Sequence, residues 1–278
     1  MTRWSTITRK EVRSLVTSRT PKIGIGLVAV VFVVGGYITP VTVENPAVTS
    51  VALEDYDRFL RGIVVFLVPL FGLLLGYRSV VGERVSGQLA LTLSFPYSRT
   101  DVVFGKALGR ALVLVATIAA GTLGAAALVE YPFGSVSLTT LAVFLSATAL
   151  YGLVFLAIGI GLSTVTASTR RATVLTFAVF FLSAVAWPQL EGYLLDALQY
   201  VNLAGETLPD WARFVYGAEP TLLYQRVMDA FVADVTVGPY LGPSAPWYLG
   251  GGTAAVLLAV WALLPALGGY VRFRRADL

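Results

Sequence analysis

The sequence of 278 residues contains no cysteine and no histidine. Without thiolate or imidazole side chains, the chain cannot form disulfides, the usual zinc sites, a cysteine nucleophile or a serine–histidine triad. A large part of enzyme chemistry is thereby excluded. We expect no catalytic residues and no metal site in this chain.

Charge is also scarce. Only 13% of the residues are charged and 56% are hydrophobic, whereas soluble domains carry about 25% charged residues. A soluble chain of this length needs a polar exterior. The composition therefore predicts an integral membrane protein.

Six uncharged, apolar stretches are long enough, or nearly so, to cross a bilayer as helices, because a span needs about 20 such residues. These stretches predict an all-α membrane fold with six transmembrane helices in a single domain, residues 1–278. They cover residues 23–39, 62–77, 111–129, 138–164, 172–187 and 249–271.

The predicted spans contain no Asp, Glu, Lys or Arg. Ion-coupled transporters and proton pumps place such groups at mid-membrane. A GxxxxGK[ST] phosphate-binding loop is also missing, since Gly105–Lys106 is followed by Ala107. If the protein moves a substrate uphill, we expect the energy to come from a partner.

Basic residues gather on one side of the predicted spans, whereas acids such as Glu191, Asp196 and Glu206 gather on the other. The positive-inside rule then places both termini in the cytoplasm and the protein in the cell membrane. The net charge of +4 indicates contacts with anionic lipid rather than nucleic acid. The basic side holds Arg3, Arg9, Lys10, Arg13, Arg19, Lys22, Arg78, Arg84, Arg99, Lys106, Arg110, Arg170, Arg171, Arg272, Arg274 and Arg275.

Residues 3–19 have the pattern of an amphipathic helix lying at the membrane interface. Apolar residues from Trp4 to Val16 fall on one side at 100° per residue, and Arg3, Arg9, Lys10 and Arg13 fall opposite. A disordered basic leader is the alternative. The small-residue pattern of signal-peptide cleavage does not follow.

Residues 78–110 form the longest connection on the basic side. We expect two helical pieces broken near residues 94–96, because Pro96 stops the first and Ser98 or Thr100 can cap the second ahead of Asp101. The first piece mixes Glu83 and Arg84 with apolar residues, as a surface that projects from the membrane would. A loop that merely joins two spans is the alternative.

Residues 188–248 form an outer segment that is too polar to span. Apolar residues repeat at helical spacing from Leu190 to Val201, and a second helix is expected after Pro220. Glycine and proline at 238–243 then break the chain. From these residues alone, a small extracytoplasmic cap is one interpretation of the segment.

Glycine pairs occur within the predicted spans, Gly72 with Gly76 and Gly159 with Gly161. Such pairs let helices approach closely. We expect them to serve packing within one bundle rather than a dimer seam.

Three short motifs resemble the ABC-2 family of transporter permeases: Gly-Glu-Arg-x-Ser-Gly at 82–87, Pro-x-Ser-Arg at 96–99 and Gly-Lys-x-x-Gly at 105–109. The ending at 273–278 is also similar. The chain departs from the family pattern at Gln88, where threonine or serine is usual, and at Glu219–Pro220, where Asn-Pro is usual. Residues 67–81 and 105–114 look most like the permease associated with nitrous-oxide-reductase maturation.

The resemblance implies a non-enzymatic permease subunit of an ATP-driven exporter that works by alternating access. It implies a homodimer and a separate ABC-type ATPase subunit, which carries the ATP and Mg, so no cofactor is expected in this chain. A membrane anchor or maturation factor that docks soluble partners is the alternative.

The resemblance also implies that short helices of residues 188–248 form an exit gate, a cap with no transport role being the alternative, and it implies roles for individual residues. In such transporters the segment between the second and third spans sits in a groove of the ATPase. Glu83 and Arg84 would pair with its charges, and Val85 and Leu89 would fill the groove. The implied coupling residues are Gly82, Glu83, Arg84, Val85, Ser86, Gly87 and Leu89, and the implied anchors at the lipid headgroups are Pro96, Arg99, Lys106, Arg170 and Arg171.

Overall fold

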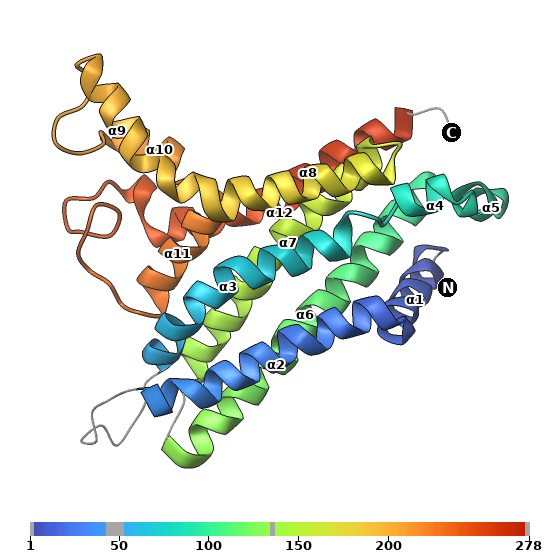
Figure 1. The fold of residues 1–278 in the computed structure, drawn as a ribbon, viewed down its shortest axis with the longest axis horizontal. Coiled ribbons are helices and arrows are strands. Elements are labelled where there is room, and N and C mark those ends of the chain that lie inside the picture. Colours follow the sequence, from blue (N-terminus) through green and yellow to red (C-terminus); the bar gives the residue numbers. More distant parts are fainter. Residues whose placement is uncertain (1–2, 43–52, 134–136, 276–278) are drawn as a thin grey trace.

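The structure, a computed structural model, describes residues 3–42, 53–133 and 137–275, so tail residues 276–278 lie outside it. Its long helices run alongside one another in an elongated bundle (Figure 1). Helix α1 begins and α12 ends at the same end of the bundle. The long helices are α2 (Arg19–Thr42), α3 (Leu53–Gly76), α6 (Arg99–Phe133), α7 (Leu138–Val165), α8 (Thr169–Phe181) and α12 (Gly251–Arg275).

Five helical stretches are long and apolar enough to cross a membrane. A sixth candidate is the pair Trp4–Thr17 and Pro21–Gly35, whose two helices are bent by 72° relative to each other. The chain is therefore a multi-pass, helical membrane protein. The five stretches are Arg61–Val85, Arg99–Leu128, Leu138–Val165, Thr169–Tyr200 and Gly251–Arg272.

Helix α7 lies at the centre of the bundle and packs against α3 and α12. It is apolar on all sides, as a helix surrounded by protein should be, and its Tyr151 is fully buried. A Cβ added to Gly76 of α3 would lie 2.7 Å from the Leu156 carbonyl oxygen, and one added to Gly159 would lie 2.9 Å from that of Leu73. The glycine pairs thus serve packing within the bundle, as predicted.

The predicted amphipathic helix is present as α1 (Arg3–Thr17), which lies across α6. It buries Ile7 and Leu15 and exposes Arg9, Lys10 and Arg13. Helix α2 begins only two residues after α1 ends.

The connection after α3 differs in detail from the prediction. Two short helices, α4 (Val81–Val85) and α5 (Gln88–Ser94), replace a single first piece. They are separated at Gly87, whose φ of +76° is left-handed and favours glycine. As predicted, α6 follows the proline, and Ser98 is its cap: the Asp101 amide donates to Ser98 Oγ at 3.0 Å, and the Ser98 amide donates to Asp101 Oδ2 at 3.0 Å.

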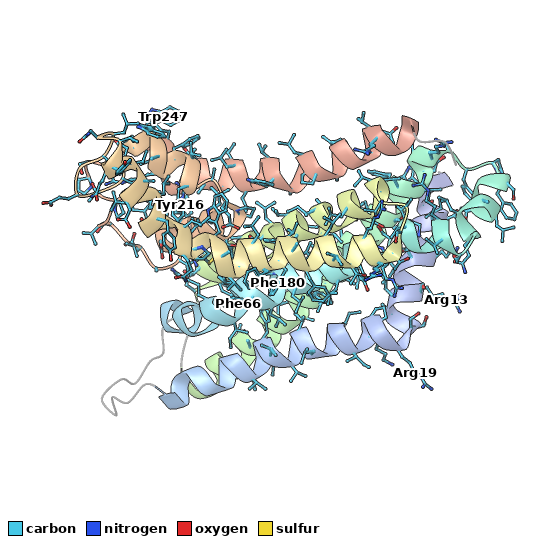
Figure 2. The ribbon with its side chains drawn as sticks, turned by 45° about the horizontal axis from the view of Figure 1, so that its top comes forward. Arg13, Arg19, Phe66, Phe180, Tyr216 and Trp247 are labelled. Atoms are coloured by element: carbon cyan, nitrogen blue, oxygen red, sulfur yellow. The ribbon has the colours of Figure 1, made fainter. Side chains whose placement is uncertain are left out.

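At the opposite end, α8 continues through a π-helical turn, η1 (Leu182–Ala186), and a 3₁₀ turn, η2 (Trp187–Gln189). Next come the two expected helices, α9 (Leu190–Tyr200) and α11 (Pro220–Phe231), and between them α10 (Asp210–Tyr216), which the sequence analysis missed. A last 3₁₀ turn, η3 (Trp247–Leu249), precedes α12. Figure 2 shows Tyr216 and Trp247 at this end and Arg13 and Arg19 at the other.

Helix α11 turns back into the bundle. Its Leu223, Tyr224 and Met228 are fully buried and belong to the same apolar core as α7. The buried Arg226 fastens the returning helix, because its guanidinium donates to the carbonyl oxygens of Leu249 at 3.0 Å and Gly217 at 3.2 Å.

Candidate functional site

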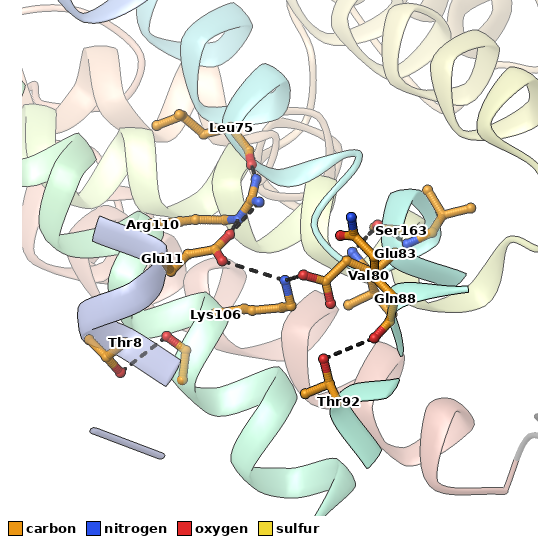
Figure 3. Close-up of polar contacts among 12 residues, drawn as sticks. Thr8, Glu11, Leu75, Val80, Glu83, Gln88, Thr92, Lys106, Arg110 and Ser163 are labelled. Carbon is orange, nitrogen blue, oxygen red and sulfur yellow. Dashed lines mark hydrogen bonds and ion pairs between the residues drawn. The ribbon is translucent and has the colours of Figure 1, made fainter. Parts of the chain in front are cut away.

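A buried cluster of ion pairs lies where α1, α4 and α6 meet (Figure 3). The side chain of Lys106, near the start of α6, is 4% exposed. Its ammonium lies 2.8 Å from Glu83 Oε1 on α4 and 3.4 Å from Glu11 Oε2 on α1. One cation thus joins two helices that are far apart in the sequence.

Arg110, one turn after Lys106, extends the cluster. Its Nε donates to Glu11 Oε1 at 2.7 Å, and its Nη1 donates to the carbonyl oxygen of Leu75 at the end of α3. Burial raises the pKa of Glu11, but the charges of Arg110 and Lys106 outweigh this effect and hold the pKa below its ordinary value. Because two cations face two carboxylates, every charge in the cluster has a partner, which burial requires.

Two glycines let α1 approach α6 closely enough for these contacts. A Cβ on Gly105 would lie 2.8 Å from the Ile7 Cβ, and one on Gly109 would lie 2.9 Å from the Glu11 Cβ. Thr8 Oγ1 also donates to the Gly105 carbonyl oxygen at 3.1 Å. The Gly-Lys-x-x-Gly motif therefore builds the crossing of α1 and α6.

The other side of α4 is fixed to α7. Ser163 Oγ accepts from the backbone amides of Val80 at 2.9 Å and Val81 at 3.0 Å. These amides belong to the first turn of α4, where no carbonyl group of the helix itself is available as a partner. The α4–α5 hairpin, residues 81–95, is thus held by α6 through Lys106 and by α7 through Ser163.

Leu89 does not lie where the sequence analysis placed it. Its side chain is 2% exposed and packs in a small apolar cluster with Ile7, Val80 and Val102. It therefore supports the hairpin from within and has no free surface to fill a partner's groove. The reason is the break at Gly87, which turns α5 so that Leu89 faces α1 and α6.

The apolar surface that the hairpin does expose comes from three other positions. Val85 is 60% exposed and was among the predicted coupling residues, whereas Leu91, 67% exposed, and Phe95, 63% exposed, were not. Ser86 and Gly87 are exposed beside them, and Gly82 and Arg84 are half-buried.

The charged residues of the motif also differ from the expectation. Lys106, expected at the headgroups, points into the protein and binds Glu83 and Glu11. Glu83 therefore has one oxygen, Oε1, engaged within the chain, while Oε2 has no hydrogen-bond partner among the described residues. The other expected anchors are on the surface or partly so: Pro96, Arg170 and Arg171 are exposed and Arg99 is half-buried.

A groove of about 460 Å³ lies between α1 and the hairpin and reaches the ion-pair cluster. Its walls are polar as well as apolar, because Lys10 and Gln88 line it together with Leu91 and Phe95. The groove and the exposed apolar side chains form one surface at the end of the bundle where α1 begins.

Glu11, Gly105, Gly109 and Ser163 are the residues of this site whose roles sequence reasoning missed. Glu11 is the only acidic residue of α1, and Lys106 and Arg110 are one turn apart on α6, so a pairing of α1 with α6 was available as a signal. Ser163 carried no local signal, because it lies inside an apolar span.

Comparison with known proteins identifies the family. The family model of the ABC-2 family transporter proteins matches residues 5–278. A probable ABC transporter permease protein NosY from Pseudomonas aeruginosa is 27% identical over 223 residues, which cover 79% of each chain. A protein of the same description from Stutzerimonas stutzeri is 28% identical over 221 residues, 78% of each chain. The chain thus belongs to the ABC-2 family and is the transmembrane permease component of an ABC transporter.

Proposed function

We propose that this permease is an exporter that works by alternating access, as a homodimer with two copies of an ABC-type ATPase. ATP and Mg bind to the ATPase, and this chain supplies the path through the membrane. The observation that carries the proposal is the α4–α5 hairpin, which exposes Val85, Leu91 and Phe95 directly above the buried Lys106 cluster.

The hairpin is placed in the cytoplasm in this proposal. Support comes from the exposed cations of the same end, among them Arg9, Lys10, Arg170 and Arg171. The chain has no native cysteine, so single variants report topology directly. We expect Val85→Cys to react with a membrane-impermeant maleimide only in opened cells, and Tyr200→Cys to react in intact cells.

The contacts of the hairpin supply the coupling path. A movement of α4 would be transmitted to α6 through the Lys106–Glu83 pair. It would be transmitted to α1 through Glu11 and to α7 through Ser163. Oε2 of Glu83 is buried and has no hydrogen-bond partner among the described residues, so Glu83 acts in this proposal through its pair with Lys106 rather than through a contact with the ATPase. Arg84 would pair with an acid of the ATPase.

Glu83→Gln tests this coupling, because it keeps the size of the side chain and removes its charge. A hydrogen bond to a charged group contributes about 1.5–3 kcal/mol, so we expect ATP-driven transport by the complex to fall about tenfold or more. The permease should still purify with its normal size. Thr17→Ala, at the end of α1, is the matched control. Unchanged transport in Glu83→Gln would contradict the assignment.

A further inference from the structure

Glu219 is a carboxylate buried in the part of the bundle opposite the hairpin. Its side chain is 7% exposed. It caps α11, because Oε2 accepts from the amides of Thr221 at 2.7 Å and Leu222 at 3.0 Å. A cap with a negative charge also suits the positive end of the helix.

The second oxygen of Glu219 reaches another helix. Oε1 accepts from Thr221 Oγ1 at 2.9 Å and from the hydroxyl of Ser183, which belongs to the π-helical turn η1. Ser183 Oγ and Thr221 Oγ1 are 3.3 Å apart. Between Ser183 and Glu219 the chain leaves the bundle as α9 and α10. The hydrogen bond between these two residues therefore joins the point where the chain leaves to the point where it returns.

Further polar contacts continue inward from the cap. The Tyr151 hydroxyl of α7 lies 3.1 Å from Thr221 Oγ1 and 3.1 Å from the Val65 carbonyl oxygen of α3. On its other side the cap borders a cavity of about 440 Å³, whose remaining walls are mostly apolar and include Trp261. Ser183 and Glu219 therefore line the cavity on one side and join the hydroxyl contacts of Thr221 and Tyr151 on the other.

Helix α8 connects this contact to the hairpin. It touches α4 at one end, and its continuation η1 touches α11 at the other. It is also one of the two least buried spans, so it can shift at a smaller packing cost than α3 or α7. The π-helical turn at Ser183 interrupts the regular hydrogen bonds, and such turns permit local changes of register.

We propose that Ser183 and Glu219 form a latch that holds α11 against α8 and closes the outer end of the permease. When the hairpin moves α8, the hydrogen bond breaks and α11 lifts from the bundle. The latch rests on the proposed transport function, because it assigns the step at which the outer end opens.

A reporter cysteine behind α11 tests the latch in the resting protein. Thr148 of α7 is fully buried and hydrogen-bonds Tyr224 of α11 at 3.1 Å, so Thr148→Cys reacts with an impermeant maleimide only when α11 lifts. In the variant T148C/S183A, which keeps the cap of α11, we expect labelling to be about fivefold faster than in T148C alone. This is the effect of one lost hydrogen bond.

The matched control is T148C/T176A. Thr176 of α8 likewise carries a buried hydroxyl, but its bond goes to the Ala172 carbonyl oxygen within the same helix. We expect its labelling rate to equal that of T148C. Equal rates in all three proteins, or equal acceleration by S183A and T176A, would overturn the latch.

A disulfide tests whether the latch must open during the cycle. The hydroxyls of Ser183 and Thr221 are close enough for S183C/T221C to bridge. In the purified complex with its ATPase, oxidation should lower ATP hydrolysis at least about fivefold, and reductant should restore it. In the S183C and T221C single variants, which cannot form the bridge, ATP hydrolysis should be the same before and after oxidation of each variant.

The outcomes separate the two proposals. If the parent permease binds no ATPase, the transport function fails and the latch with it. If the parent complex hydrolyses ATP but the bridged protein is equally active, or the bridge does not form, the latch alone is wrong.

Discussion

Lys106 Nζ lies 2.8 Å from Glu83 Oε1, which ties the start of α6 to the hairpin at the surface. The ammonium also contacts Glu11 of α1 and is almost completely buried. Lys106, which the sequence analysis assigned to the lipid headgroups, therefore connects the exposed hairpin to the transmembrane helices inside the protein.

Lys106→Met should destabilise the protein strongly, because it removes the cation that pairs with Glu83 among the described residues and leaves Glu11 with Arg110. Breaking a buried pair costs about 3–5 kcal/mol. We expect thermal unfolding in detergent to shift down by several degrees. Lys10 is an exposed cation of α1, so Lys10→Met should shift the unfolding temperature by less than one degree. Equal melting temperatures for all three proteins would contradict the assigned pairing.

The crossing of α1 and α6 gives a second prediction. In Gly109→Ala the added methyl would lie 2.9 Å from the Glu11 Cβ and 3.1 Å from the Thr8 carbonyl oxygen, so α1 must move. Overpacking of this kind costs about 1–3 kcal/mol. Gly26→Ala meets nothing within 4 Å and should be neutral or slightly stabilising. Thermal unfolding of the two variants, measured side by side, checks the difference.

The long helices and the amphipathic helix that precedes them follow from local patterns, since apolar stretches of span length and a 100° periodicity identify them. The roles of Glu11, Leu89 and Glu219 do not, because each depends on a contact made by residues distant in the sequence. Glu219 lies outside every apolar stretch of the sequence, and it is buried beside Ser183 only because α11 turns back into the bundle.

The turn of the hairpin gives a third prediction. Gly87→Ala places a Cβ at a φ of +76°, which costs about 1–2 kcal/mol for a residue with a side chain. The hairpin should lose its shape, and the amount of ATPase that co-purifies should fall. Gly82→Ala lies in α4, where the added Cβ makes only an ordinary 3.7 Å contact with Arg78, and should retain the ATPase.

Acidification should weaken the attachment of α1 to α6, because it protonates Glu11. Its folded-state pKa is held below the ordinary value of 4.5. The stability that its ionised form contributes is thus fully present above about pH 4.5 and is lost as the pH falls through the folded-state pKa. Glu11→Gln should melt lower at neutral pH and lose less on acidification. Parallel melting curves between pH 7 and 3 would contradict this.

The exposed hairpin is proposed to bind an ATP-hydrolysing subunit. The most direct measurement is the amount of P-loop ATPase that co-purifies with the tagged permease in mild detergent, identified by mass spectrometry and assayed for ATP hydrolysis. We predict near-equal stoichiometry for the parent and for Tyr200→Glu at the opposite end, and loss of the ATPase in V85E/L91E. Retention of the ATPase by V85E/L91E, or its absence from the parent, would contradict the account and favour a membrane anchor.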